Sequence, residues 1–141
     1  MSTLHFKIIT PERVVFEDEI DQISMMTPNG EITVLPHHIP LVTLLSPGEL
    51  HYKKNNEDKD LAVSGGFAEV RDNNSVVILA DTAEHAHEIN VERAETARAR
   101  AAQLMAEARG KDDVDFAALQ IQLEKALLRL KVGNRYRKLK P

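Results

Sequence analysis

The sequence predicts an α+β protein in which a series of short β-strands, folded into a sandwich or a barrel, precedes two α-helices. Short apolar segments separated by Gly, Pro and Asn turns occupy the chain up to about residue 88, and Ala- and Leu-rich segments with helical spacing follow. The charge changes at the same place. Residues 1–88 hold 6 Lys/Arg and 15 Asp/Glu, a net of −9, whereas residues 89–141 hold 12 and 7, a net of +5, which together give the chain's −4. We therefore expect two modules with different partners, as in a connecting or regulatory protein.

The first module contains nine expected strands. In residues 4–8 every second side chain is apolar, which is typical of a strand with one buried face. Turn signals separate the segments, among them the Pro-Asn-Gly of residues 28–30 and the Asp-Asn-Asn of residues 72–74. Residues 55–58 are expected to form a polar hairpin tip, and Gly65-Gly66 permits a close or kinked backbone. The expected strands cover residues 4–8, 14–16, 20–26, 32–35, 41–45, 50–54, 61–63, 67–70 and 76–79.

The first helix is expected to begin after Asn90, an N-cap, with Glu92 in its first turn. Residues 93–109 lack Gly and Pro and are rich in Ala, so their helix propensity is high, and Gly110 is expected to end the helix. Small and apolar residues at three- and four-residue spacing define its packing stripe. The stripe consists of Ala94, Ala97, Ala101, Leu104 or Met105, and Ala108.

The second helix is expected to begin after a capping aspartate, Asp113 or Asp115. Its seam consists of Phe116, Leu119, Leu123, Ala126 or Leu127, and Leu130. The short link between the helices predicts an antiparallel hairpin. Ile121 and Leu128 lie outside this seam, so we expect a second apolar surface, which packs either on the strand module or on another protein.

Several classes of function are not expected. The chain has no cysteine, which excludes disulfides, thiolate catalysis and Cys-ligated zinc. No apolar run reaches the roughly 18–20 residues that span a bilayer, and no secretory signal is visible at the N-terminus. Ser64 lacks the flanks of a nucleophile elbow, and phosphate-binding glycine patterns are missing. The pairs His37/His38 and His85/His87, of which the second could share a strand face, suggest no third ligand, so no metal site is expected.

Six segments together resemble the epsilon subunit of bacterial F-type ATP synthases. The segments are TPER at 10–13, GEITVLPHHIP at 30–40, SGGFAEV at 64–70, ILADTAE at 78–84, INVERA at 89–94 and DVDFA at 113–117. They span nearly the whole chain. The resemblance implies an antiparallel β-sandwich of about ten short strands in residues 1–87, followed by an antiparallel two-helix hairpin in residues 88–141.

The resemblance also implies a function. The protein would be a non-catalytic subunit at the foot of the central stalk, where residues 1–87 couple the gamma subunit to the c ring during proton-driven ATP synthesis. The hairpin would inhibit ATP hydrolysis when it extends toward the alpha and beta subunits. Such a protein is peripheral on the cytoplasmic face of the bacterial membrane and meets the membrane only through the complex. Glu31 and His38 lie in the region that faces gamma and the c ring in the family.

The family also includes versions whose hairpin binds ATP. The positions that the resemblance assigns to the ligand are Glu84, Ile89, Asn90, Arg93, Arg100, Lys125 and Arg129. Arg93 and Arg100 are seven residues apart on one side of a helix. Converging cations can hold a triphosphate. Asn90 stands where the family motif has an acid, so we expect weakened affinity for a regulatory ATP and no required cofactor.

The end of the chain is basic, with seven Lys/Arg against one acid from residue 124 onward. In the family such a segment is attracted to an acidic patch on a beta subunit, an attraction that weakens with salt. The residues assigned to this inhibitory contact with alpha and beta are Arg129, Lys131, Arg135, Arg137 and Lys138.

Two other functions remain open on the sequence. One is a free-standing nucleotide sensor, whose hairpin closes on its ligand without a rotary partner. The other is nucleic-acid binding through the basic end, which the acidic strand module and the lack of a groove-reading motif oppose.

Overall fold

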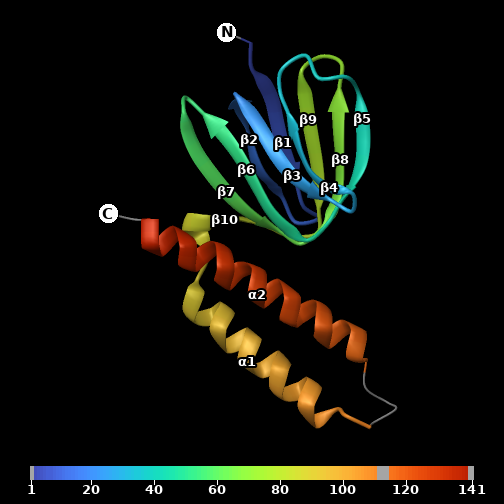
Figure 1. Ribbon diagram of the computed structural model, residues 1–141, viewed down its shortest axis with the longest axis vertical. Helices are drawn as coiled ribbons and strands as arrows, with labels where there is room; N and C mark the ends of the chain where they lie inside the picture. Colours follow the sequence, from blue (N-terminus) through green and yellow to red (C-terminus); the bar gives the residue numbers. More distant parts are fainter. Residues whose placement is uncertain (1, 111–114, 140–141) are drawn as a thin grey trace. The chain divides into compact units, whose positions relative to one another are not determined.

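The computed structural model describes residues 2–110 and 115–139, and the chain divides into two compact units, residues 1–86 and 87–141 (Figure 1). Strands build the first unit and two helices build the second. The strands are β1 (Leu4–Ile9), β2 (Val14–Ile20), β3 (Gln22–Thr27), β4 (Gly30–Val34), β5 (Leu41–Leu45), β6 (Gly48–Lys54), β7 (Glu57–Val63), β8 (Gly66–Arg71), β9 (Ser75–Ala80) and β10 (Ala83–His85). A 3-10 turn, η1 (Ala86–Glu88), precedes α1 (Val91–Glu107) and α2 (Phe116–Leu139).

The strands form two five-stranded sheets, in the orders β2-β1-β9-β8-β5 and β10-β7-β6-β3-β4. Strand pairs are antiparallel except β1 with β9, which is parallel. Alternate residues of each sheet point into a shared core: Leu4, Phe6 and Ile8 of β1 are fully buried, as predicted. The predicted antiparallel sandwich is confirmed, and the two separate sheets rule out a barrel.

The hairpin between β6 and β7 has a tip of two residues. Asn55 and Asn56 both have positive φ, 52° and 65°, which is the backbone of a type I′ turn. Glu57 lies in β7 opposite Lys54, so the prediction of a polar tip over residues 55–58 is wrong. The carboxylate of Glu57 lies 3.5 Å from Nζ of Lys59, two residues along the same strand, so its charge is paired within β7.

The predicted strand over residues 20–26 is also wrong, because Ile20 ends β2 and Gln22 begins β3. The sequence predicts only residues 14–16 of β2, because the acidic Glu17 and Glu19 in its second half are not typical of a strand. β2 is an edge strand, where charge is tolerated. The ring of His5 lies between these two side chains, with Nε2 2.8 Å from Glu17 Oε2 and Nδ1 2.9 Å from Glu19 Oε1. The hydrogen bond to Glu17, and to a smaller extent the one to Glu19, raises the pKa of His5.

β10 was not expected from the sequence. It pairs with β7 and ends at His85, which is buried with Nε2 3.0 Å from the hydroxyl of Tyr52. Burial raises the pKa of Tyr52 to about 12. His87 belongs to η1, so His85 and His87 do not share a strand face, an arrangement that the sequence left possible.

The start of α1 agrees with the sequence. The Oδ1 atom of Asn90 accepts a hydrogen bond from the backbone N–H of Arg93 at 2.9 Å, which confirms the N-cap. The helix ends at Glu107, and Gly110 follows with φ +80°.

The packing stripe of α1 differs from the prediction at one position. Ala97 is exposed, and the buried alanines recur every seven residues at Ala94, Ala101 and Ala108. The position between them is occupied by Arg98, which is half-buried and pairs with Glu95. The stem of an arginine can cover apolar surface while its head stays in water, so a charge in the sequence concealed a seam position.

The Oδ1 atom of Asp115 accepts a hydrogen bond from Ala118 N at 3.1 Å at the start of α2, whereas Asp113 lies outside the described residues. Ala126 is buried in the seam, but Phe116 is 39% exposed, so its assignment to the seam is wrong. Ile121 is exposed, as expected for a residue outside the seam. The helices are antiparallel, as predicted, because the end of α2 lies beside the start of α1.

Candidate functional site: partner-binding surfaces

Residues 2–110 and 115–139 contain no group of three or more His, Cys, Asp and Glu side chains that could hold a metal ion. In the same residues no helix is long and apolar enough to cross a bilayer.

An apolar row crosses the outer face of the first sheet. Leu44 of β5 is opposite Phe67 of β8, and Phe67 is opposite Leu79 of β9. All three side chains are 53% exposed. Their neighbours along each strand point inward, and Ala68 and Ile78 are fully buried. We call Leu44, Phe67 and Leu79 the apolar row. Exposed apolar side chains in a contiguous group mark surfaces that bind a partner.

Polar and apolar residues border the apolar row. The next register line joins Val42, which is 71% exposed, to Glu69. Glu69 accepts a hydrogen bond from Arg71 Nε at 3.2 Å. A shallow hollow of about 450 Å³ lies beside Val42, between the start of β5 and the turn that joins β8 to β9. An apolar centre with a polar border is the usual composition of a protein–protein interface.

Gly66 sets the close approach of β8 to β9 beneath the apolar row. Its φ is +141°, and a Cβ built there would lie 2.0 Å from the carbonyl oxygen of Leu79. The neighbouring Gly65 also has positive φ, +117°. The close approach at Gly66 agrees with the close or kinked backbone that the Gly-Gly pair permits, and Phe67 follows it on the outer face.

Glu31 lies just after a rigid two-residue turn between β3 and β4. The hydroxyl of Thr27 donates to Gly30 O at 2.6 Å and accepts from Asn29 N at 3.2 Å. Glu31 is exposed and pairs across the ladder with Met26. Glu31 is thus an exposed residue next to a hydrogen-bonded turn, at one end of β4.

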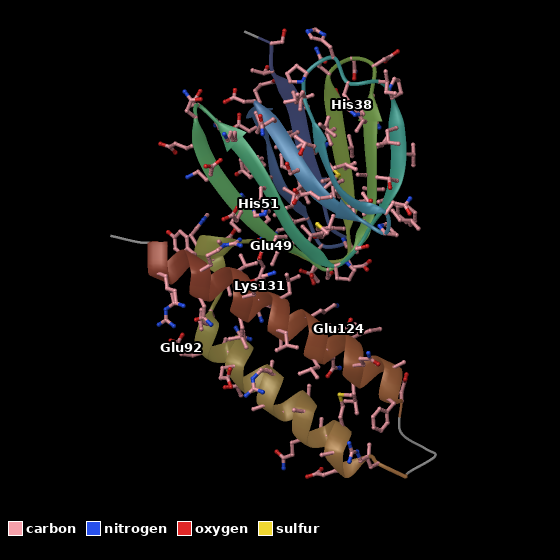
Figure 2. All side chains as sticks on the ribbon, viewed as in Figure 1. His38, Glu49, His51, Glu92, Glu124 and Lys131 are labelled. Carbon is pink, nitrogen blue, oxygen red and sulfur yellow. The ribbon has the colours of Figure 1, made fainter. Side chains whose placement is uncertain are left out.

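His38 lies beyond the other end of β4, in the loop that leads to β5 (Figure 2). Its N–H donates to Leu35 O at 3.1 Å, and its Nδ1 donates to Ile39 O at 2.6 Å. The preceding His37 has φ 70° and donates its N–H to Asn74 Oδ1 at 2.6 Å. The structure therefore orders the His38 loop, but it places Glu31 and His38 at opposite ends of β4 and does not bring them together.

Four of the residues proposed for ATP line one side of the hairpin. Arg93 and Arg100 are exposed on α1, and Lys125 and Arg129 are half-buried on α2. Each immediately precedes a residue of the helix seam, and in an antiparallel pair the residues one step before the seam lie on the same side. The four seam residues are Ala94, Ala101, Ala126 and Leu130. The hairpin thus carries a cationic strip along this side.

The other three positions proposed for ATP lie outside this cationic strip. Ile89 precedes α1 and is half-buried, and Asn90 uses its Oδ1 atom to cap the helix. Glu84 is half-buried on β10 opposite Ala62 and belongs to the unit of residues 1–86.

The residues proposed for the inhibitory contact lie on the second half of α2. Lys131 occupies this half, whereas Glu124 lies nearer the start of the helix (Figure 2). Arg137 and Lys138 are exposed, and Arg137 Nη2 lies 3.0 Å from Glu92 Oε1 of α1. The proposed contact residues on this segment are Arg129, Lys131, Arg135, Arg137 and Lys138.

The apolar row was missed from the sequence, although a signal was present. An antiparallel sheet with one wet face alternates apolar and polar residues. The predicted strand at 41–45 and the run at 76–79 are apolar at nearly every position. Apolar residues on both faces of a strand favour burial of both faces, whereas in this chain alone the second face is exposed at Leu44 and Leu79.

Comparison with known proteins identifies the family. The model of the ATP synthase delta/epsilon chain beta-sandwich domain matches residues 3–86, and that of the long alpha-helix domain matches residues 87–134. The ATP synthase epsilon chain of Herpetosiphon aurantiacus is 46% identical over 131 residues, covering 93% of this chain and 94% of the relative. That of Dehalococcoides mccartyi is 44% identical over 138 residues, covering 98% and 97%.

A solved structure shows the same fold. A chain in the cryo-EM structure of Euglena gracilis mitochondrial ATP synthase, OSCP/F1/c-ring in rotational state 1, superposes with a TM-score of 0.75. It is 23% identical and covers 98% of this chain and 82% of its own. The two domain models follow each other along the chain and the curated relatives match it almost from end to end, which confirms the resemblance. This chain belongs to the family of ATP synthase epsilon chains.

Proposed function

We propose that this chain is a non-catalytic subunit of the central stalk in a bacterial F-type ATP synthase. Its strand unit binds the gamma subunit and the c ring and couples them during proton-driven ATP synthesis. The observation that carries this proposal is the apolar row, which needs a partner to remove it from water. The chain then associates with the cytoplasmic face of the membrane only through the complex.

The two ends of β4 provide further contacts to gamma and the c ring. Glu31 stands on the rigid β3–β4 turn, and His38 stands in the loop that Asn74 holds through His37. Ordered backbone at both positions favours a contact surface that does not have to fold on binding. Because such a surface divides its binding energy among many residues, single changes at Glu31 or His38 should have modest effects.

The hairpin acts as a brake on ATP hydrolysis in this proposal. It forms its own compact unit, so it can change position while the sandwich stays folded. Ile121 and Leu127 are exposed on α2 and offer apolar surface to another subunit. The basic end adds attraction to acidic groups on alpha and beta. Arg137 must then exchange its pairing with Glu92 for the partner's carboxylates.

ATP would regulate the brake by binding the cationic strip of the hairpin. A triphosphate on this side of the hairpin would accept charge-assisted hydrogen bonds from Arg93, Arg100, Lys125 and Arg129. The ligand would favour the closed hairpin because only the closed pair brings the cations of both helices together. The amide of Asn90 lacks the charge that a carboxylate would provide, so the affinity should be weak.

The test measures ATP hydrolysis by an alpha, beta and gamma assembly that lacks this subunit. The full chain or residues 1–87 would be added back in matched amounts, and gamma binding would be measured for both. We expect both to bind and only the full chain to slow hydrolysis. Equal hydrolysis with the two proteins would remove the brake. Failure of both to bind gamma would overturn the stalk assignment and favour a free-standing nucleotide sensor.

A further inference from the structure

The second half of α2 contains a glycine, Gly133, at a position without space for a side chain. Gly133 is buried, and a Cβ built there would lie 2.9 Å from Cγ2 of Val91 and 3.0 Å from Cγ2 of Ile89. Both methyl carbons are attached directly to a Cβ, so they can move aside only by rotation about the stiff χ1 of a β-branched residue. Glycine is unfavourable in a helix interior, so the close contact with Ile89 and Val91, and not helix propensity, explains a glycine at position 133.

Two further contacts join the same two stretches of chain. The rings of His87 and Tyr136 lie with centroids 6.4 Å apart. The guanidinium of Arg137 lies 3.0 Å from the carboxylate of Glu92. Residues 87–92 therefore lie along residues 133–137, with the glycine contact beside an aromatic contact and an ion pair. We call these three contacts the clasp.

We propose that Gly133 is a notch that receives Ile89 and Val91, and that closure of the hairpin depends on this notch. The clasp includes residues that precede α1, so α2 cannot separate from α1 without also releasing the segment before it. The regulatory consequence of this inference rests on the proposed function. There the extended hairpin inhibits ATP hydrolysis, and the closed hairpin, in which α1 and α2 pack together, does not. The notch is then a positioning element that biases the brake toward its released form.

The effect of an alanine at position 133 distinguishes a notch from an ordinary helical site. At an ordinary site Gly→Ala strengthens the helix and therefore favours the hairpin. At the notch the added methyl group collides with Val91 and Ile89, so the hairpin should open although α2 becomes a better helix. Asn134 is exposed and adjacent, and Asn134→Ala raises helix propensity without entering the notch. It is the matched control.

The experiment uses the full chain, which has no native cysteine. Spin labels on cysteines introduced at the exposed Ala99 of α1 and Gln122 of α2 report the distance between the helices. A closed hairpin gives one short distance, since packed helix axes lie about 8–10 Å apart. We expect Gly133→Ala to lower the ratio of closed to open molecules roughly five- to a hundredfold, the range for overpacking of a close contact. Asn134→Ala should leave it unchanged or raise it.

A rescue variant identifies the contact responsible. Val91→Ala removes the nearest methyl group, so the double variant Val91→Ala/Gly133→Ala should recover most of the short distance. Far-UV circular dichroism checks that the helices persist in every variant. A closed hairpin in Gly133→Ala, or an opening that neither Val91→Ala nor Ile89→Ala relieves, would overturn the notch. Neither result involves other subunits, so the notch can fail while the brake stands.

Discussion

Replacing Phe67 by Ala should weaken binding to the gamma-containing assembly about thirtyfold and leave the fold intact. A phenylalanine side chain presents about 200 Å² of surface. Because Phe67 is 53% exposed, about 100 Å² of it remains to be buried by a partner. At about 25 cal/mol per Å² this area represents about 2.5 kcal/mol, of which the Ala methyl group retains a part. The expected loss is about 2 kcal/mol, or about thirtyfold in Kd.

The assay is titration of the alpha, beta and gamma assembly with labelled full chain. The matched control is Val14→Ala, which truncates an apolar side chain of similar exposure, 49%, on the edge strand β2, outside the apolar row. This control should leave gamma binding by the sandwich unchanged. Because part of the Phe67 side chain is already covered by its neighbours in the sheet, the variant should melt at a lower temperature than wild type but stay folded at the assay temperature.

Two results would refute the reasoning. Wild-type affinity of a folded Phe67→Ala variant would show that the apolar row lies outside the interface and would remove the main support for the stalk proposal. An equal loss in Phe67→Ala and Val14→Ala would show that binding depends on apolar surface in general and not on the row.

The remaining predictions concern stability and ligand affinity. Gly66→Ala should destabilise the sandwich by at least about 3 kcal/mol, since it adds a Cβ 2.0 Å from a carbonyl oxygen at φ +141°, and an unchanged melting temperature would contradict the close approach. His5 has a pKa raised above 6.5, so the folded chain binds its proton more tightly than the unfolded chain does. Its stabilising pairing with Glu17 and Glu19 is fully present below pH about 6.5 and is lost as the pH rises through the folded pKa. The melting temperature of His5→Gln should therefore fall below wild type more at pH 5.5 than at pH 8.5, and a pH-independent difference would exclude the linkage. Asn90→Asp keeps the helix cap and restores a carboxylate, so calorimetry should show ATP binding up to about tenfold tighter, and unchanged or weaker binding would separate Asn90 from the ligand.

Much of the architecture could be predicted because local signals agreed with the tertiary fold. Alternation in residues 4–8 identified a buried strand face, and Asn90 marked the start of α1. The long Ala-rich segment has high helix propensity whatever surrounds it. The choice between sandwich and barrel depends on pairs distant in sequence, such as β1 with β9, and local patterns carry no information on such pairs.

The parts that were missed depend on neighbours in space. The acidic Glu17 and Glu19 lie in an edge strand because His5 stands between them. Arg98 occupies the seam position that the apolar pattern of the sequence assigned to Ala97. The apolar row consists of one residue from each of three strands, so only the strand registers reveal it. The notch at Gly133 likewise requires Ile89 and Val91 to be placed beside it.

The parallel pairing of β1 with β9 constrains the order in which the chain can fold during synthesis. β1 lies between β2 and β9, yet it ends at Ile9 and its second neighbour begins only at Ser75. Until the ribosome has released β9, the hairpin of β1 and β2 exposes an unpaired edge and an uncovered apolar face. The first sheet can therefore be completed only after β9 has been synthesised, near the end of the strand unit. The helices emerge from the ribosome after that point. A growing chain is consequently most exposed to aggregation and to proteases before β9 appears, and the strands of the sandwich are all available for pairing before α2 has emerged.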